Sequence, residues 1–424
     1  MKKTLSILLT AIVAVSTAQA QWVSQNSPNL PNTMLYEVEA VDANVTWAAS
    51  PFMEVVKTTD GGLTWKSYPV VDPVFTSASI TSVTALNANT AWIVVAEMGQ
   101  TNFSRIYRTT DGGTTWQHQP TAYTNPGSYG EYIHFFDPNN GLAIGFASAP
   151  GNTTKTEILT TSDGGTTWSQ VPAANMPAAP SADVLYNTLA TVGNTVWVMD
   201  FDFNILKSVD KGLTWTSASS GLTFSNLEGS LAFTDANNGL AGLNGQLRRT
   251  TDGGATWMTV TPTGPFFPFR IIAIPGTSSY ISSNRDRNNP GSSISHDHGN
   301  TWILLENTMS HLDMEFADAT TGYSAGFAVM RKFGSNISGI KKELSMAGSY
   351  AIFPNPSPGT LQVLPASDKP YTIEVYDVTG NRINRQTGNR FGKTQLDLGK
   401  EKKGIYMLHI ITGNQRFVKK VVLQ

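Results

Sequence analysis

The sequence contains no cysteine among its 424 residues, so neither disulfide bonds nor thiolate metal sites are open to it. Charged residues make up only 14% of the chain and the formal net charge is −2, which excludes a broad basic surface for nucleic acid or anionic lipid. The sequence has no HxH or HExxH spacing and no glycine-rich phosphate loop that opens a helix. We therefore expect no bound metal ion and no cofactor, and stability that comes from packing.

Long apolar runs are also missing, except at the start of the chain. The first twenty residues combine Lys2 and Lys3 with an apolar run from Leu5 to Val15 and the small residues Ala18 and Ala20. This pattern predicts a secretory signal peptide over residues 1–20, the alternative being a buried N-terminal helix. No later segment approaches the ~20 apolar residues of a membrane helix. We expect an exported protein with no membrane span.

Turn formers and tryptophan are abundant, with 37 Gly, 22 Pro and 10 Trp, and this composition indicates an all-β chain. One eight-residue pattern recurs six times, with Ser or Thr two residues before an Asp, Gly two after it, Thr four after and Trp five after. The copies are TTDGGLTW (58–65), TTDGGTTW (109–116), TSDGGTTW (161–168), SVDKGLTW (208–215), TTDGGATW (250–257) and SHDHGNTW (295–302).

The spacing of this pattern has a chemical reason. Glycine permits the positive φ of a tight turn, and the Asp carboxylate accepts hydrogen bonds from the amide groups of that turn. The Thr and Trp that follow suit the outgoing strand of a hairpin. We interpret the aspartates as structural residues of the turn: Asp60, Asp111, Asp163, Asp210, Asp252 and Asp297.

The repeat period predicts the architecture. The tryptophans of successive copies stand 42 to 52 residues apart, about the length of a four-stranded propeller blade. A second pattern, two short strands joined by a turn, occurs seven times, for example at 38–50 and 314–326. The seventh blade lacks its own Trp, but QWVSQNSP at residues 21–28 resembles the start of the outer strands. We predict a seven-bladed β-propeller over residues 21–334, closed by a strand from the mature N-terminus.

The repeated element resembles the Asp-box, or BNR, repeat of sialidases, xyloglucanases, sortilin-type receptors and the photosystem II assembly factor family. The spread of the boxes is most similar to that of the assembly factors, which form a single seven-bladed propeller. This resemblance implies a structural role for the boxes on the outer part of each blade. It also implies a chaperone-like binding role.

The C-terminal segment carries a second resemblance. SYAIFPNPSPGTLQV (349–363), IEVYDVTGNRI (373–383) and LDLGKEKKGIYMLHI (396–410) resemble the sorting domain that directs Bacteroidetes proteins through type IX secretion. The resemblance implies an address recognised by the type IX secretion machinery, with the protein released or held at the cell surface. From its own pattern the segment 349–424 is predicted to form a small β-sandwich, and residues 335–348 a linker.

Polar residues alternate with apolar ones on the first strand of each predicted blade. Aligned on the turn that follows, they form one ring of positions, with Glu39, His134 and Glu315 two residues further on. The loops expected on the same face carry Tyr129, Glu131 and Arg285. We predict a funnel site from these positions: Glu37, Tyr132, His134, Arg270, Asp313, Glu315 and Arg285. The alternative is that the ring consists of hydrogen-bonded polar groups between blades.

The sequence favours binding over catalysis. Sialidases need an arginine triad, and the nearest approach to their first-strand motif, Phe269-Arg270-Ile271-Ile272, falls in the sixth blade. We predict a non-catalytic propeller that binds a glycan or protein ligand through its funnel face. The alternatives are a glycoside hydrolase or lyase, with Glu37, Asp313 and Glu315 as candidate carboxylates, and a purely structural surface component.

Overall fold

The computed structural model describes most of the chain in two compact units, residues 1–333 and 334–424. The residues that it describes are 22–25, 34–75, 77–97, 103–125, 127–149, 153–177, 183–223, 229–327, 329–334, 351–353, 355–364, 371–377, 380–388, 394–412 and 415–424. The predicted signal peptide (1–20) and linker (335–348) lie outside the described residues.

The described residues of the first unit form seven four-stranded antiparallel sheets, the blades. Blades 1 to 3 consist of β2 (Glu37–Ala40), β3 (Thr46–Ser50), β4 (Glu54–Thr58) and β5 (Lys66–Pro69); β6 (Ser79–Ala85), β7 (Ala91–Glu97), β8 (Phe103–Thr109) and β9 (Gln117–His118); and β10 (Ser128–Phe135), β11 (Gly141–Ala149), β12 (Thr153–Thr161) and β13 (Ser169–Gln170). A short 3₁₀ helix (Ala173–Asn175) follows blade 3.

The remaining blades have the same order. Blades 4 to 7 consist of β14 (Ala190–Val192), β15 (Thr195–Met199), β16 (Asn204–Ser208) and β17 (Thr216–Ser219); β18 (Gly229–Phe233), β19 (Gly239–Leu243), β20 (Gln246–Thr250) and β21 (Met258–Val260); β22 (Arg270–Ala273), β23 (Tyr280–Asn284), β24 (Gly291–Ser295) and β25 (Ile303–Glu306); and β26 (Asp313–Phe316), β27 (Gly322–Gly326), β28 (Val329–Phe333) and β1 (Trp22–Ser24).

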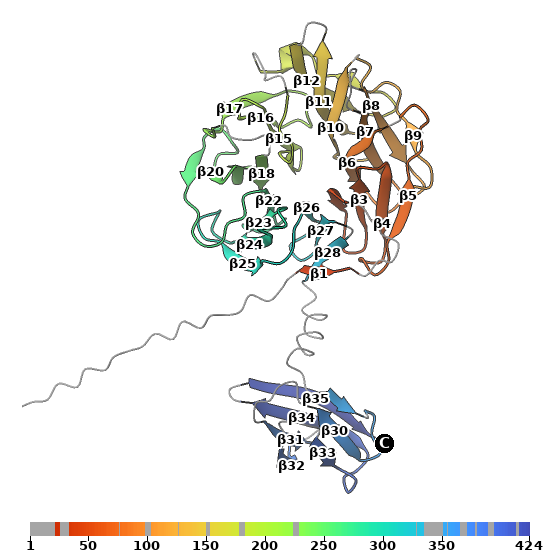
Figure 1. The fold of residues 1–424 in the computed structure, drawn as a ribbon, viewed down its shortest axis with the longest axis vertical. Coiled ribbons are helices and arrows are strands. Elements are labelled where there is room, and N and C mark those ends of the chain that lie inside the picture. The colour runs from red at the N-terminus through yellow and green to blue at the C-terminus, as the bar shows by residue number, and fades with distance from the viewer. Residues whose placement is uncertain are drawn as a thin grey trace, which may run out of the picture. The chain divides into compact units, whose positions relative to one another are not determined.

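Figure 1 shows the blades arranged in a ring, with the first strands β6, β18, β22 and β26 on its inner side. The chain has this arrangement because each sheet is packed on both faces by its neighbours. The second strands β3, β19 and β27 are accordingly buried at every residue. The first strand β2 alternates buried and half-buried residues, since one side of it faces the axis. The predicted all-β propeller is confirmed.

The ring is closed by the N-terminal segment, as predicted. Strand β1 pairs antiparallel with β28, with Trp22 opposite Phe333. The Trp22 side chain is 1% exposed, its indole packs edge-on against Phe333 at 5.0 Å, and its Nε1 donates to the Ser292 hydroxyl at 3.0 Å. Pairing the last blade with the start of the chain covers the edge that β28 would otherwise present.

The six Asp hairpins, as we name the turns at Asp60, Asp111, Asp163, Asp210, Asp252 and Asp297, join the third and fourth strands of their blades. In the second copy the Thr115 amide donates to Asp111 Oδ1 at 2.9 Å and the Thr115 hydroxyl to Oδ2 at 2.6 Å. The Thr109 hydroxyl donates to Asp111 and accepts from the Gly113 amide, whose residue has a φ of +91°. The same bonds recur in the other copies, so each carboxylate is used within its own turn.

The tryptophans of the hairpins do not lie in the outgoing strand, contrary to the prediction. Trp65 stands one residue before β5, which begins at Lys66. The reason is visible in three copies, where the indole folds back on the turn: Nε1 of Trp215 donates to the Gly212 carbonyl at 2.8 Å. Trp257 and Trp302 make the same bond to the glycines three residues before them.

The second unit consists of two sheets. One has the order β29 (Ala351–Phe353), β30 (Thr360–Leu364) and β33 (Thr394–Asp397), and the other β32 (Arg382–Thr387), β31 (Thr372–Tyr376), β34 (Gly404–Thr412) and β35 (Gln415–Leu423). Both sheets contribute to one core, in which Leu361 and Leu396 pack with Ile373 and Leu408. This is the predicted small β-sandwich.

Candidate functional site: the funnel cavity

The first strands of all seven blades, with the residues next to them, line a cavity of about 420 Å³, which we name the funnel cavity. Six of the seven residues predicted for the funnel line it: Glu37, Tyr132, His134, Arg270, Asp313 and Glu315. The seventh, Arg285, lies in a separate hollow of about 670 Å³ with Phe269 and Phe327. Its guanidinium stacks 4.8 Å from the ring of Phe269, because it belongs to the loop between β23 and β24 rather than to a first strand.

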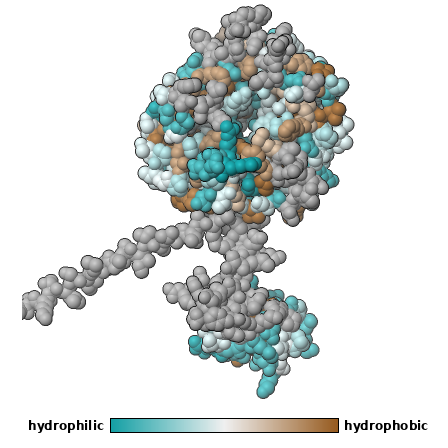
Figure 2. Space-filling model, viewed as in Figure 1, coloured by the Kyte–Doolittle hydropathy of each residue, from teal (hydrophilic) through white to brown (hydrophobic). Residues whose placement is uncertain are grey.

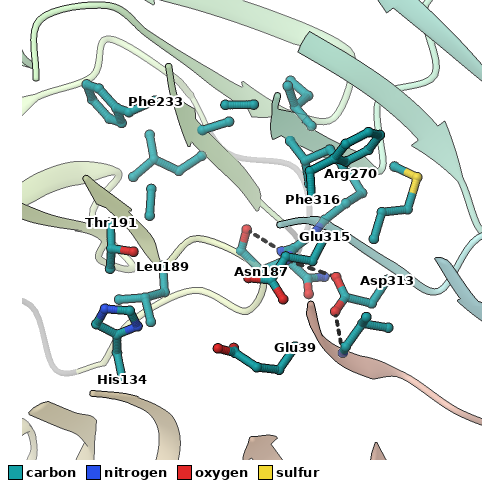
Figure 3. Close-up of a pocket in the computed structure, with 18 of the residues that line it drawn as sticks. Glu39, His134, Asn187, Leu189, Thr191, Phe233, Arg270, Asp313, Glu315 and Phe316 are labelled. Atoms are coloured by element: carbon teal, nitrogen blue, oxygen red, sulfur yellow. Dashed lines mark hydrogen bonds and ion pairs between the residues drawn. The ribbon is translucent and has the colours of Figure 1, made fainter. Parts of the chain in front are cut away.

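Among the described residues that line the funnel cavity, Arg270 is the only arginine or lysine. Figure 3 shows its side chain reaching between Asn187 and Asp313. Nη2 forms an ion pair with Asp313 Oδ1 at 2.9 Å, and Nη1 donates to the Asn187 carbonyl at 3.0 Å. Burial disfavours the charged form of Arg270, but Asp313 and Glu37 outweigh it and raise the pKa of the guanidinium. The charge of Arg270 is thus held by the acidic side of the cavity.

Several polar residues of the ring link neighbouring blades. Asp313 Oδ2 accepts from the Val38 amide at 2.9 Å, and Glu315 Oε2 accepts from the Ala40 amide at 2.6 Å. Ser82 and Ser230 accept in the same way from first-strand amides of blades 3 and 6. The inner edge of a blade has amide groups without a strand partner, and these side chains bind them. The ring therefore makes the hydrogen bonds between blades that the alternative interpretation predicted, and it also lines a cavity.

Glu37 and Glu39 of β2 are the other two carboxyl groups of the ring, and no ion pair formed by the described residues includes them. Burial raises the pKa of Glu37 well above its usual value; the negative charge of Asp313 adds to this, and Arg270 opposes it. Burial also raises the pKa of Glu39 to about 8, although the Ala85 amide lowers it. In Figure 3 the Glu39 carboxyl extends into the space between His134 and Glu315. One side of the cavity therefore presents carboxyl groups without a cation.

His134 and Tyr132 come from β10. Burial lowers the pKa of His134 to about 4, so its imidazole is neutral near neutral pH. The Tyr132 hydroxyl donates to the Leu185 carbonyl at 2.5 Å and accepts from the Thr188 amide at 3.1 Å. Tyr132 thus links blade 3 to the segment before blade 4, whereas His134 is the imidazole that faces the cavity.

Two residues expected in loops lie in a strand instead. Tyr129 and Glu131 belong to β10 and are 8% and 2% exposed. A β-bulge between Gly130 and Tyr132 places Glu131 outside the regular pairing, which alternating polarity in the sequence does not reveal. The sequence analysis did not identify Tyr36 and Tyr186 as candidate site residues. Both directly precede ring residues, Glu37 and Asn187, and this position could have indicated them.

A serine, a histidine and a glutamate also meet in blades 6 and 7. His311 Nδ1 lies 2.6 Å from the Ser324 hydroxyl and Nε2 lies 3.0 Å from Glu306 Oε1. The residue types are those of a hydrolase triad, but the two ring nitrogens are exchanged, since in such a triad Nε2 faces the serine and Nδ1 the carboxylate. Ser324 and His311 are 0% exposed and Glu306 is 6% exposed, and none of them lines the funnel cavity. The group is therefore a buried structural network with no access for a substrate.

No group of three or more potential metal ligands occurs within the described ranges. In the same part of the chain, no helix has the length and apolar character to cross a membrane.

The comparisons with known proteins concern both units. Residues 351–424 match the family described as secretion system C-terminal sorting domain. This segment is a type IX sorting domain. The sorting domain indicates that the protein is exported, to the cell surface or the medium, and that the secretion machinery acts on it. No curated protein matches the chain.

Solved structures resemble the first unit. YCF48 bound to D1 peptide has 16% sequence identity and a TM-score of 0.56, and the match covers 75% of this chain and 99% of that chain. YCF48 from Cyanidioschyzon merolae has 16% identity and a TM-score of 0.56 over 74% of this chain and 98% of that chain. The WD40 propeller domain of Doa1 has 14% identity and a TM-score of 0.50 over 75% and 98%. At these identities the likeness concerns the propeller fold alone.

Proposed function

We propose that this exported propeller is a binding protein that takes a segment of another protein at its funnel face. The observation that carries the proposal is the acidic side of the funnel cavity, where Glu37 and Glu39 face the space without an ion pair. A ligand that brings a positive charge would offset the repulsion among these carboxyl groups. Figure 2 shows strongly hydrophilic residues beside the central opening of the ring, which suits a polar ligand.

The fold supports a protein ligand rather than a glycan. One propeller of similar fold, YCF48, is described as bound to a peptide. A channel lined by the ends of first strands admits an extended chain, and polar groups at fixed positions can orient it. A glycan remains the other ligand class predicted from the sequence, and the experiment below separates the two.

The test is binding of the full chain to a peptide array and a glycan array, beside Glu37→Gln and Glu54→Gln variants. Glu54 lies on the third strand of blade 1, outside the funnel cavity, and is the matched control. We expect peptides with basic residues to bind and Glu37→Gln to weaken them about tenfold, since a charge-assisted contact contributes ~1.5–3 kcal/mol. Binding of glycans alone, or equal weakening by both variants, would overturn the peptide proposal.

A glycoside hydrolase is the second candidate, and one observation favours it. Glu37 and Asp313 lie close enough to influence each other, and a protonated carboxyl beside an ionised one is the arrangement that acid catalysis needs. Asp313 is, however, held by Arg270 and by the Val38 amide. Release of reducing sugar from any bound glycan, lost in Glu37→Gln, would establish this function.

A further inference from the structure

A second acidic pair lies at one end of the inner strands, outside the funnel cavity. Glu131 is the extra residue of the bulge in β10, where Gly130 pairs with Gly145 and Tyr132 with Ile144. Its side chain is 2% exposed, and its carboxyl oxygens accept no hydrogen bond from a backbone amide or a cationic side chain of the described residues, with only the Asp183 carboxyl and the Tyr186 hydroxyl beside them. A buried carboxyl group without a cation or an amide needs an explanation, such as an absent ligand.

Blade 2 provides a natural comparison. Strand β6 has the same bulge, between Ile80 and Ser82, and the residue at the bulge is Thr81. The Thr81 hydroxyl donates to the Gly130 carbonyl at 2.8 Å. The bulge itself therefore does not force a side chain to stay without a partner. What differs in blade 3 is the carboxyl group.

Asp183 is the neighbour of Glu131. It is 7% exposed, and Oδ1 accepts from its own following amide, that of Val184, at 2.7 Å. No ion pair formed by described residues includes either carboxyl group. Burial and then the charge of Asp183 raise the pKa of Glu131 well above its usual value, and the Tyr186 hydroxyl only partly opposes this. Burial raises the pKa of Asp183 to about 7. Without a cation, the pair retains a proton.

Two tyrosines lie beside this pair, and a third lies beside these two. Tyr36, Tyr129 and Tyr186 are close enough to influence one another, and Tyr129 and Tyr186 also interact with Glu131 and Asp183. Tyr186 is 38% exposed, so it is the member of the group that solvent reaches. Aromatic faces beside carboxylates attract organic cations through the ring quadrupole and the opposite charge. A metal ion is less suited, because hard cations take about six to eight oxygen ligands and no group of three or more potential metal ligands occurs among the described residues.

We propose that Glu131, Asp183 and the tyrosines Tyr36, Tyr129 and Tyr186 form a subsite for a lysine or arginine side chain of the protein ligand. This inference rests on the proposed function and names the side chain that the funnel face selects. Tyr36 and Tyr186 directly precede Glu37 and Asn187, which line the funnel cavity, so the subsite adjoins the residues of that cavity along the chain. When the cation binds, the proton of the acid pair is released.

The experiment measures the affinity of the full chain for short oligolysine, oligoarginine and oligoglutamine peptides of equal length by calorimetry. We expect the two cationic peptides to bind and oligoglutamine to bind weakly. Glu131→Gln should weaken oligolysine about 10- to 100-fold, since a charged hydrogen bond is lost, while Glu54→Gln leaves it unchanged. Repeating the titration in buffers of different ionisation enthalpy should reveal release of a proton in the unmodified chain and not in Glu131→Gln.

The tyrosines have their own test. Tyr186→Phe keeps the ring and should retain affinity, whereas Tyr186→Ala should lose several-fold. Thermal melting identifies any variant that fails to fold, and Asp183→Asn then takes the place of Glu131→Gln. Equal affinity for oligolysine in the unmodified chain and these variants would overturn the inference.

The two proposals fail in different ways. If oligolysine binding depends on Glu37 but not on Glu131, the funnel proposal stands and the subsite is wrong. If neutral peptides bind and cationic ones do not, the inference is again overturned while a protein-binding function remains. Absence of binding by every peptide tested, here and on the array, would overturn both.

Discussion

The Asp hairpins and the funnel cavity both contain carboxyl groups, but the pKa values of these groups shift in opposite directions. In the hairpins, hydrogen bonds from the side chain and amide of Thr115 lower the pKa of Asp111 to about 2. In the cavity, burial raises the pKa of Glu39 to about 8. The difference is burial against the supply of donors: each hairpin surrounds its exposed carboxylate with hydroxyl and amide groups, whereas in the cavity burial outweighs the one amide that lowers the pKa of Glu39. The hairpin groups therefore serve the fold, and the cavity groups are left for a ligand.

Removing Arg270, the cation of the cavity, should have the largest effect on stability. Arg270→Met leaves Asp313, whose side chain is 4% exposed, beside Glu37 without its ion pair. We expect the free energy of unfolding to fall by about 3–5 kcal/mol, as for a buried pair that loses one partner. All ten tryptophans lie between residues 22 and 302, so denaturant unfolding followed by tryptophan fluorescence reports on the propeller. The double variant with Asp313→Asn should recover part of the loss; a double variant as unstable as the single would show that the charge is not the cause.

Removing a hairpin carboxylate should have a smaller effect. Asp210→Ala takes the acceptor from the Thr214 amide and hydroxyl and from the Ser208 hydroxyl. We expect a loss of about 1–2 kcal/mol in the same unfolding measurement, because these donors can turn to water in a partly exposed turn. Asp202→Ala, an exposed aspartate in the loop before β16, is the control and should change stability by less than about 0.5 kcal/mol. Equal effects of the two changes would contradict a structural role for the hairpin.

Of the three changes, Glu39→Gln should have the smallest effect on stability, and this effect should appear only at high pH. The folded pKa of Glu39, about 8, lies above the ordinary value, so its contribution to stability is complete at low pH and is lost as the pH rises towards 8. The variant should match the unmodified chain near about pH 5 and exceed it by roughly 1 kcal/mol near about pH 9, the effect being limited by partial solvent access. Melting temperatures over this range measure it. A variant that is less stable at high pH would mean that the ionised carboxylate is satisfied after all.

The propeller could be derived from the sequence because its signals are local and repeated. The turn at Asp111 needs only residues 109–116, and seven copies of a two-strand pattern give the number of blades. The closing strand at Trp22 was also predictable, since it copies the start of other outer strands. The position of Trp65 before β5 was not, because it depends on how the turn packs.

The sequence could also place some residues of the funnel site and not others. The alternation of polar residues along first strands placed Glu37, His134 and Glu315 at one cavity, since residues two apart share a face of a strand. The sequence could not place Arg285, which stacks on Phe269 in a separate hollow, since the path of a loop is not periodic.

The sequence alone determined the blades, the hairpins, the closing strand and the sorting domain, because each depends on residues close together or on a repeated pattern. The tertiary structure alone decided which carboxyl groups have partners. Asp313 is held by Arg270 and Val38, whereas Glu131 is turned by a bulge towards Asp183. The partners of a carboxyl group depend on its burial and on donors from other blades. The residues next to it in the sequence determine neither.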